Sequence, residues 1–395
     1  MKIHIVTKTG CPYCEKAKDL LNQLGKTFTV EVLDDDVARK AFYEKCGNGV
    51  KSVPQIFLDD ERIGGYTDLL KNIERITGRL KLEDPSITYK PFRYPWAVDR
   101  ARKHEQTHWI EDEIPLGEDV SDWKGNKLTD QEKLFITNIL KLFTQSDLAV
   151  SDLYHDYLIQ KFKNNEIRMM LASFANIEKI HQRSYALLNE TLGFPDSDWY
   201  AFLEYEQMKD KVEFMKDSDL SSKKGTALAL AKNVFSEGVI LFASFAMLLN
   251  FSRFGKMKGM CKIVEFSIRD ENAHCEGIAE LFTTYVKENP RVWNDELKKA
   301  VYEMAKKVVE LEDAFVNMTF SLGEPEGLTE KEVKDYVRFI TNKRLLSLGM
   351  KEIFDVTENP LPWIDWLVSG SKHTNFFEAR VSSYQTSGLV GEWTY

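Results

Sequence analysis

Two pairs of acidic and imidazole residues repeat a spacing that suits metal binding. Glu178 stands three residues before His181, and Glu271 stands three residues before His274. Because an α-helix turns about 100° per residue, each pair lies on one face of a helix, about one turn apart. A carboxylate and an imidazole placed in this way can reach a common cation. The spacing therefore predicts metal ligands on two different helices.

The first of these helices places charge on an apolar face. Drawn as a helix, residues 174–188 bring Glu178, His181 and Tyr185 to the same face as Phe174 and Leu188. Charged groups on such a face are costly unless they are paired or bound to a metal. A buried metal centre would explain why this pattern is present.

A lone carboxylate interrupts the most apolar segment of the chain. Glu237 is the only charged residue between Lys232 and Arg253. Helical bundles that hold two iron or two manganese ions take a Glu from each of two helices and a Glu-x-x-His pair from each of two others. We therefore expect Glu237 to join a dinuclear centre. Carboxylate-rich sites accept iron and manganese alike, so the sequence leaves the metal open.

A fourth helix must supply one more carboxylate, and it offers two. Asp147 and Asp152 are five residues apart and lie on different faces of their predicted helix, so spacing alone does not choose between them. Leu140 and Phe143 lie on the side of Asp147. This apolar neighbourhood favours Asp147.

The same spacing also arises by chance in this chain. Glu105 and His108 have it, and Asp152 and His155 nearly do. Both pairs stand in polar, charged stretches, and we expect them on the surface.

Two cysteines near the N-terminus form a second reactive group. Cys11 and Cys14 follow the predicted strand "KIHIVT" and begin a predicted helix. A thiol at a helix N-terminus has a lowered pKa, and a second thiol one turn later can attack a mixed disulfide. Half a zinc site is the alternative, but the other three cysteines form no second pair. The pattern therefore predicts thiol–disulfide exchange.

The elements around these groups divide the chain into two domains. Residues 1–79 show the β-α-β-α-β-β-α order of an α/β thioredoxin-like fold. Residues 80–98 contain several prolines and are predicted to be a linker that becomes helical near Asp99. From residue 99 onward strand signals nearly vanish, and several long helices predict an all-α bundle.

Composition excludes some classes of partner. The net charge of −9 argues against a nucleic-acid-binding surface. The longest apolar run, residues 238–249, is too short to span a bilayer, and no signal peptide is recognised. Five cysteines without framework spacing are typical of a cytoplasmic protein.

The first 79 residues resemble glutaredoxin. The resemblance rests on "CPYC", "SVPQIF" and "GGYTDL". It implies a cis peptide bond between Val53 and Pro54, and it makes Cys46 a bystander. It also implies that glutathione reduces this domain and contacts Tyr13, Val53, Pro54, Tyr66, Thr67 and Asp68.

Residues 86–395 resemble the small, radical-generating subunit of class I ribonucleotide reductase. The motifs are "FTQSD", "EKIHQRSY", "FSEGVILFASF", "RDENAH" and "NFFEARVSSY". The resemblance implies a ferritin-like domain at residues 99–375, a flexible tail at residues 376–395 that docks to a large catalytic subunit, and a homodimer. The implied metal ligands are Asp147, Glu178, His181, Glu237, Glu271 and His274, and this pattern selects Asp147 over Asp152.

The resemblance also implies a path for a radical. Tyr185 would hold it, although some relatives store the oxidising equivalent on manganese, and a buried tyrosine of the core is the simpler interpretation. Trp109, Asp270 and Tyr384 would relay the radical to the large subunit. Trp96 is the alternative to Trp109, and Tyr395 is the alternative to Tyr384.

Together the two resemblances imply a reductase subunit that carries its own reductant. The bundle would generate the radical for reduction of ribonucleotides to deoxyribonucleotides, and the fused glutaredoxin would reduce the disulfide left in the large subunit. Two alternatives remain. One is a stand-alone di-metal oxidase or oxygenase of the ferritin-like superfamily, and the other is a thiol-dependent redox scaffold whose bundle is structural.

Overall fold

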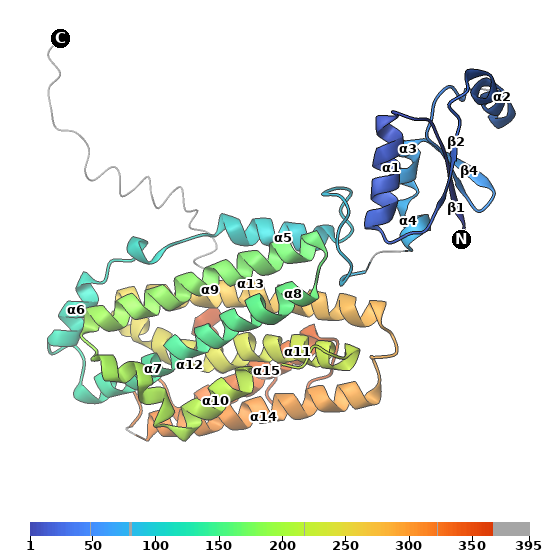
Figure 1. The fold of residues 1–395 in the computed structure, drawn as a ribbon. Coiled ribbons are helices and arrows are strands. Elements are labelled where there is room, and N and C mark those ends of the chain that lie inside the picture. Colours follow the sequence, from blue (N-terminus) through green and yellow to red (C-terminus); the bar gives the residue numbers. More distant parts are fainter. Residues whose placement is uncertain (48, 79–80, 217, 322, 366–395) are drawn as a thin grey trace, which may run out of the picture. The chain divides into compact units, whose positions relative to one another are not determined.

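The computed structural model describes residues 1–365 apart from residues 48, 79–80, 217 and 322. The chain divides into two compact units, with the division between Asp84 and Pro85 (Figure 1).

The first unit is a small α/β domain built on a four-stranded sheet. The strands are β1 (Ile3–Thr7), β2 (Thr29–Val32), β3 (Gln55–Leu58) and β4 (Glu61–Gly64), in the order β2-β1-β3-β4. β1 pairs with β2 in parallel and with β3 antiparallel, and β3 pairs antiparallel with β4. The helices are α1 (Pro12–Gln23), α2 (Asp36–Cys46), α3 (Tyr66–Lys71) and α4 (Ile73–Thr77). The predicted thioredoxin-like order is confirmed, except that the last predicted helix is split at Asn72.

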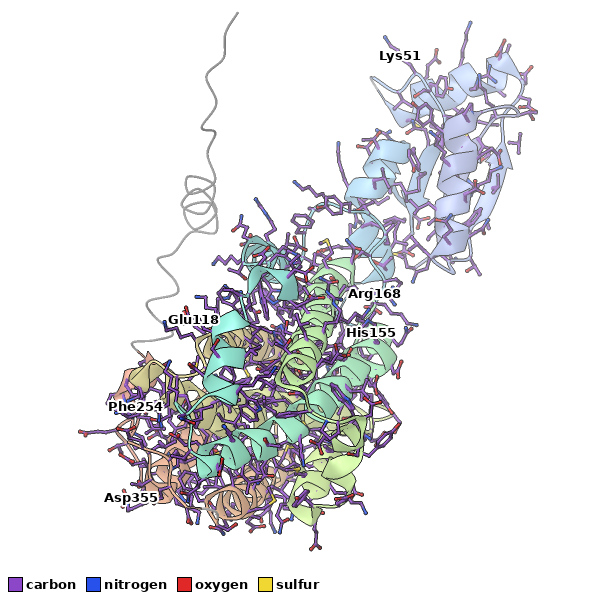
Figure 2. The ribbon with its side chains drawn as sticks, turned by 90° about the vertical axis from the view of Figure 1, so that its left-hand side faces the viewer. Lys51, Glu118, His155, Arg168, Phe254 and Asp355 are labelled. Carbon is purple, nitrogen blue, oxygen red and sulfur yellow. A yellow bond between two sulfur atoms is a disulfide. The ribbon has the colours of Figure 1, made fainter. Side chains whose placement is uncertain are left out.

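The second unit is mostly helical, and none of its described residues forms a strand. Its main helices are α5 (Pro95–Gln106), α6 (Gly117–Lys124), α7 (Asp130–Asp152), α9 (Asn165–Leu192), α10 (Glu206–Lys216), α11 (Lys223–Phe235), α12 (Leu241–Leu249), α13 (Lys258–Glu288), α14 (Asp295–Phe320) and α15 (Glu330–Ser347). Short helical segments join them: η1 (Glu111–Glu113), η2 (Leu153–Leu158), α8 (Ile159–Lys161), η3 (Asp196–Leu203), η4 (Ser236–Ile240) and η5 (Asn250–Phe254). Side chains fill the space between these helices (Figure 2).

Local signals explain where some of these helices begin. α5 starts at Pro95, four residues before the predicted start near Asp99, because proline suits the first turn of a helix. α7 starts after Thr129, whose side chain accepts a hydrogen bond from the backbone N–H of Glu132. The Glu132 carboxylate in turn accepts a hydrogen bond from the backbone N–H of Thr129, which completes a capping box.

One long helical stretch forms the centre of the bundle. Residues Lys223–Phe254 run through α11, η4, α12 and η5, and the stretch is long and apolar enough to cross a membrane by length and composition. Its most apolar window is entirely buried inside the protein, as in the core helix of a soluble bundle. The π-helical turn η4 contains Glu237 and shifts the phase of the helix there.

A buried ion pair joins α10 to α14. Lys211 Nζ lies 2.8 Å from Glu312 Oε1, and both side chains are fully buried. Lys211 also lies over the ring of Phe315, at 3.8 Å from its centroid. Burial raises the pKa of Glu312 to about 7 and lowers the pKa of Lys211. A pair of this kind is costly to desolvate.

We predict that this pair makes stability fall as the pH rises from 4.5 to about 7. In that window the folded protein keeps a proton on Glu312 that the unfolded chain releases, so folding is linked to proton uptake. The loss is on the order of 3 kcal/mol. The measurement is the free energy of unfolding by urea, followed by helical circular dichroism, for the metal-free protein. The neutral double variant Lys211→Met with Glu312→Gln is the reference, and an equal pH slope in both proteins would contradict the prediction.

Candidate metal centre

Four helical segments bring the predicted ligands together inside the bundle. α7 carries Asp147, α9 carries Glu178 and His181, η4 carries Glu237, and α13 carries Glu271 and His274. Each of these six side chains is at most 1% exposed. One ligand atom from each of four of them lies within 4.8 Å of the others; the four are Glu178, Glu237, Glu271 and His274.

Two carboxylates face both imidazoles. Glu178 places Oε1 3.0 Å from Nδ1 of His274 and Oε2 3.7 Å from Nδ1 of His181. Glu271 places Oε2 3.2 Å from Nδ1 of His274 and Oε1 3.2 Å from Nδ1 of His181. Glu178 and Glu271 would therefore hold cations together with His181 and His274.

Several buried oxygens of the cluster accept no hydrogen bond of normal geometry among the described residues, although an imidazole nitrogen lies 3.0–3.7 Å from those of Glu178 and Glu271. They are Oδ2 of Asp147, both carboxylate oxygens of Glu178 and Oε1 of Glu271. Buried carboxylate oxygens without such hydrogen bonds are costly. The four carboxylates carry up to four negative charges, which two divalent ions would balance. The residues therefore fit a dinuclear metal centre.

Protons balance part of the charge of the cluster in the absence of metal. Burial raises the pKa of Asp147 well above its ordinary value and raises that of Glu237 to about 7. Burial alone would raise the pKa of Glu178, but the two neighbouring imidazoles lower it to about 2. Burial opposes the charge on His181 and His274, yet the surrounding carboxylates raise both pKa values. Without cations the cluster holds protons, which bound metal would displace.

Glu237 is held differently from the other carboxylates. Tyr154 donates a hydrogen bond to its Oε2 at 3.0 Å, and Asn233 Nδ2 donates to its Oε1 at 2.8 Å. Neither partner was predicted from the sequence. Asn233 precedes Glu237 by four residues, which was a usable signal, whereas Tyr154 lies in the π-helical segment η2, where ordinary helical counting fails.

Tyr185 lies in an apolar pocket beside the cluster. It is 1% exposed, its hydroxyl donates to Oγ of Ser267 at 3.1 Å, and its ring stacks on Phe143 with centroids 4.6 Å apart. Burial, followed by the nearby charge of Asp147, raises the pKa of its phenol. The side chain is therefore neutral and shielded from water.

A hydrogen-bonded chain leads from the cluster to Trp109. His181 turns Nε2 away from the carboxylates, to 3.4 Å from Oδ2 of Asp270. Trp109 Nε1 donates to the same oxygen at 2.8 Å, and Arg269 Nε donates to the other oxygen at 3.0 Å. Trp109 is 1% exposed. Trp96 packs near Tyr94 instead, and Tyr384 and Tyr395 lie outside the described residues.

The residues set aside as chance occurrences lie away from the cluster. Glu105, His108 and Asp152 are exposed, and His155 is half-buried.

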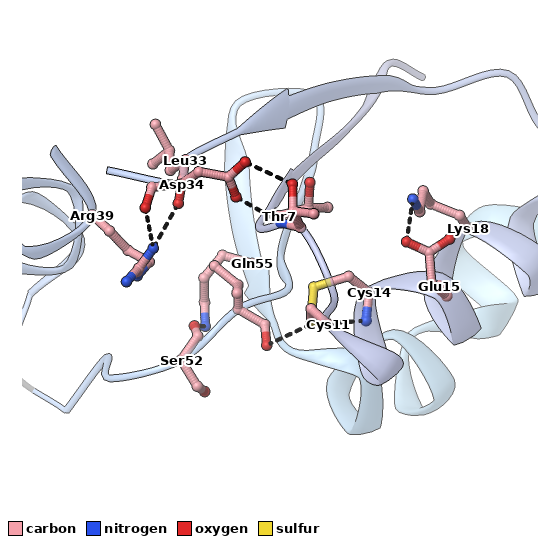
Figure 3. Close-up of a disulfide and its surroundings, with 12 residues drawn as sticks. Thr7, Cys11, Cys14, Glu15, Lys18, Leu33, Asp34, Arg39, Ser52 and Gln55 are labelled. Carbon is pink, nitrogen blue, oxygen red and sulfur yellow. Dashed lines mark hydrogen bonds and ion pairs between the residues drawn. A yellow bond between two sulfur atoms is a disulfide. The ribbon is translucent and has the colours of Figure 1, made fainter. Parts of the chain in front are cut away.

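The cysteine pair lies at the N-terminus of α1. Cys11 and Cys14 form a disulfide, and Cys11 is the N-cap, whose sulfur accepts from the backbone N–H of Cys14 at 3.2 Å (Figure 3). Cys11 Sγ lies 3.6 Å from the carbonyl oxygen of Val53, and the predicted cis bond between Val53 and Pro54 is confirmed.

The other residues predicted to contact glutathione lie on the same domain. Tyr13 is 59% exposed, with its ring 6.1 Å from that of Tyr66. Thr67 and Asp68 belong to the first turn of α3, where Asp68 accepts from the backbone N–H of Gly65. A pocket of about 390 Å³ adjoins Val53, and four of its lining side chains are cationic. The pocket is lined by Lys8, Asp36, Arg39, Lys40, Tyr43, Lys51, Ser52 and Val53.

Two family models match the chain, one for each unit. The family described as "Ribonucleotide reductase, small chain" matches residues 86–360, and the family "Glutaredoxin" matches residues 3–63. A probable ribonucleoside-diphosphate reductase small subunit of Invertebrate iridescent virus 3 is 41% identical over 336 residues, which cover 80% of this chain and 89% of that protein.

Two solved structures share the fold. The dimanganese(II) NrdF of Streptococcus sanguinis has a TM-score of 0.61 at 22% identity, over 72% of this chain and 99% of that one. The Rnr4 homodimer of Saccharomyces cerevisiae has a TM-score of 0.62 at 21% identity, over 81% of this chain and 96% of that one.

Proposed function

Because the chain belongs to the ribonucleotide reductase small-chain family and carries an N-terminal glutaredoxin domain, we propose that it is the radical-generating subunit of a ribonucleoside-diphosphate reductase. Its partner is a large catalytic subunit that reduces ribonucleotides to deoxyribonucleotides. Two copies of the chain form a homodimer, and the complex acts in the cytoplasm. The proposed parts are a glutaredoxin domain at residues 1–79, a linker at 80–98, a ferritin-like domain at 99–375 and a docking tail at 376–395.

The six buried ligands, namely Asp147, Glu178, His181, Glu237, Glu271 and His274, would hold two iron or two manganese ions. When bound, these ions would supply the oxidising equivalent from O₂. Tyr185 would lose one electron and its phenolic proton to the oxidised centre, and its burial shields the resulting phenoxyl radical from water. The stacked ring of Phe143 and the hydrogen bond to Ser267 keep its ring in place.

The observation that carries this proposal is the buried chain from His181 through Asp270 to Trp109. A metal oxidase that acts on a substrate beside its ions has no need of such a chain. Here Asp270 holds the indole N–H of Trp109 and the outer nitrogen of His181 on one oxygen. An electron can leave Trp109 toward the cluster while Asp270 stabilises the positive charge left on the indole. Tyr384 in the tail would continue the path to the large subunit.

The proposed test combines the chain with the large catalytic subunit of a class I ribonucleotide reductase. The expected product is deoxynucleoside diphosphate, formed only when both subunits and metal are present. Oxygen consumption on a small organic substrate without the large subunit would instead favour the oxidase alternative. A chain that binds no metal at all would favour the redox scaffold.

The N-terminal domain supplies the electrons for repeated turnover. The Cys11 thiolate attacks the disulfide of the large subunit, one cysteine of that subunit leaves and takes a proton, and a mixed disulfide forms. The Cys14 thiolate then displaces the second cysteine and closes the Cys11–Cys14 disulfide. Two glutathione molecules return the two electrons and leave as glutathione disulfide. The cation-rich pocket beside Val53 suits the carboxylates of glutathione.

Tethering places this reductant near the large subunit at a high effective concentration. We predict that replacing Cys11 and Cys14 by serine abolishes turnover supported by glutathione, because neither exchange step can occur. Turnover supported by dithiothreitol and the metal content are expected to stay at wild-type values. The measurement is deoxynucleotide formed with each reductant.

The matched control is Cys46→Ser, since Cys46 belongs to the same domain but forms no disulfide. It is expected to behave as wild type. Loss of metal together with loss of glutathione-supported turnover in the double-serine variant would contradict the division of labour between the domains.

A further inference from the structure

The two ligand histidines have different outer partners. His274 faces the carboxylates with Nδ1, while its Nε2 points outward and lies 3.2 Å from Nε2 of His104. His181 also faces the carboxylates with Nδ1, but its Nε2 meets the carboxylate of Asp270. Ligand histidines usually donate their outer N–H to a carboxylate, a backbone carbonyl or water. A second imidazole in that place is unusual.

The geometry assigns the hydrogens of this pair. Two ring nitrogens at 3.2 Å can share a hydrogen bond only if one carries the hydrogen and the other accepts it. A histidine that binds metal through Nδ1 carries its hydrogen on Nε2, so His274 donates and His104 accepts. His104 must then carry its own hydrogen on Nδ1, which lies 2.7 Å from Oγ of Ser173.

The surroundings of His104 support this role of acceptor. The side chain is 7% exposed, and its two ring nitrogens lie at hydrogen-bond distance from His274 and Ser173. A neutral imidazole donates through one ring nitrogen and accepts through the other, which matches one partner on each side. Its ring meets Phe174 edge to face at 5.1 Å, which holds it in place from the side of α9.

We propose that His104 is a positioning residue of the metal centre, which selects the His274 tautomer whose Nδ1 lone pair points at the cations. The inference rests on the proposed function, because it presumes that metal binds between these carboxylates. It goes beyond that function in one respect. The ion on the His274 side depends on His104, a neutral partner from α5, while the ion on the His181 side depends on the charged Asp270. Loss of one partner should therefore weaken the binding of one ion and leave the other unchanged.

The test compares His104→Gln with His104→Leu in the full-length protein. Glutamine can accept from His274 through its amide oxygen and donate to Ser173 through its amide nitrogen, whereas leucine fills the space without an acceptor. Metal-free protein is titrated with Mn²⁺, and free Mn²⁺ is followed by paramagnetic resonance. Thermal unfolding of each metal-free variant checks the fold.

The expected result is two Mn²⁺ per chain with wild-type affinity for His104→Gln. In His104→Leu one of the two ions binds about 10- to 100-fold more weakly and the other binds as in wild type. If the leucine variant does not fold, His104→Phe replaces it, because it keeps an aromatic ring against Phe174 and lacks the acceptor.

Three outcomes would overturn the proposal. The first is unchanged binding of both ions in His104→Leu, and the second is equal weakening of both ions in that variant. The third is a loss of Mn²⁺ affinity in His104→Gln as large as in His104→Leu. Failure of the wild-type protein to bind metal would be a different result, since it would remove the proposed function itself.

Discussion

Replacing Glu271 by glutamine is expected to abolish tight binding of both metal ions. Glu271 places one oxygen 3.2 Å from Nδ1 of His181 and the other 3.2 Å from Nδ1 of His274. The substitution keeps the shape of the side chain, removes one negative charge from the centre and replaces one oxygen by an amide nitrogen that cannot bind a cation. Metal content should fall from about two ions per chain, as in dinuclear carboxylate bundles, to less than one.

Metal removal provides a second measurement of the same effect. A ligand present at 100 times its dissociation constant stabilises the folded state by about 2.7 kcal/mol. A chelator should therefore lower the thermal midpoint of the wild-type protein and leave that of Glu271→Gln unchanged. The metal-free variant should be no more stable than metal-free wild type, because the substitution removes the buried carboxylate that faces both imidazoles.

Glu105→Gln is the matched control for this experiment. Glu105 has the same spacing to His108 that Glu271 has to His274, but Glu105 and His108 are exposed. The control should bind metal as wild type does. If Glu271→Gln still bound two ions tightly, the cluster would not be the metal centre.

Helical periodicity was sufficient to predict that both Glu-x-x-His pairs lie on buried helix faces. Residues three apart share a helix face, so each Glu-x-x-His pair presents both groups to one side, and apolar neighbours show which side is buried. The same criterion separated Glu178 and His181, which are buried, from Glu105 and His108, which are exposed. Spacing and apolar neighbours therefore predicted the buried positions of both Glu-x-x-His pairs.

Periodicity could not predict two residues that contact the predicted ligands from other elements. Tyr154 reaches Glu237 from a π-helical turn, where the count per turn differs from that of an α-helix. His104 reaches His274 across 170 residues of sequence, and such a contact leaves no trace in local spacing. His104 is the immediate neighbour of Glu105, yet one side chain is buried and the other exposed. Only the packing of α5 on α9 and α13 shows that His104, and not Glu105, reaches His274.

Replacing Tyr185 by phenylalanine is expected to lower turnover with the large subunit at least about 1,000-fold while leaving metal binding intact. Phenylalanine keeps the stacking on Phe143 and loses only the hydroxyl that donates to Ser267. Stability should fall by about 1 kcal/mol, the usual contribution of one such hydrogen bond. Low-temperature paramagnetic resonance of the oxygen-exposed protein should show a tyrosyl radical in wild type and none in the variant.

Tyr154→Phe is the control that shows whether the radical belongs to Tyr185 or to another buried tyrosine. Tyr154 is also fully buried, and its hydroxyl lies 3.0 Å from an oxygen of Glu237, so it is a competing donor of an electron and a proton. If Tyr185 holds the radical, Tyr154→Phe keeps the radical signal, and the Tyr185 variant loses it. A turnover-competent Tyr185→Phe protein would show that the oxidising equivalent is stored on the metals. Tyr185 would then be a tyrosine of the core, and the path to the large subunit would begin at His181.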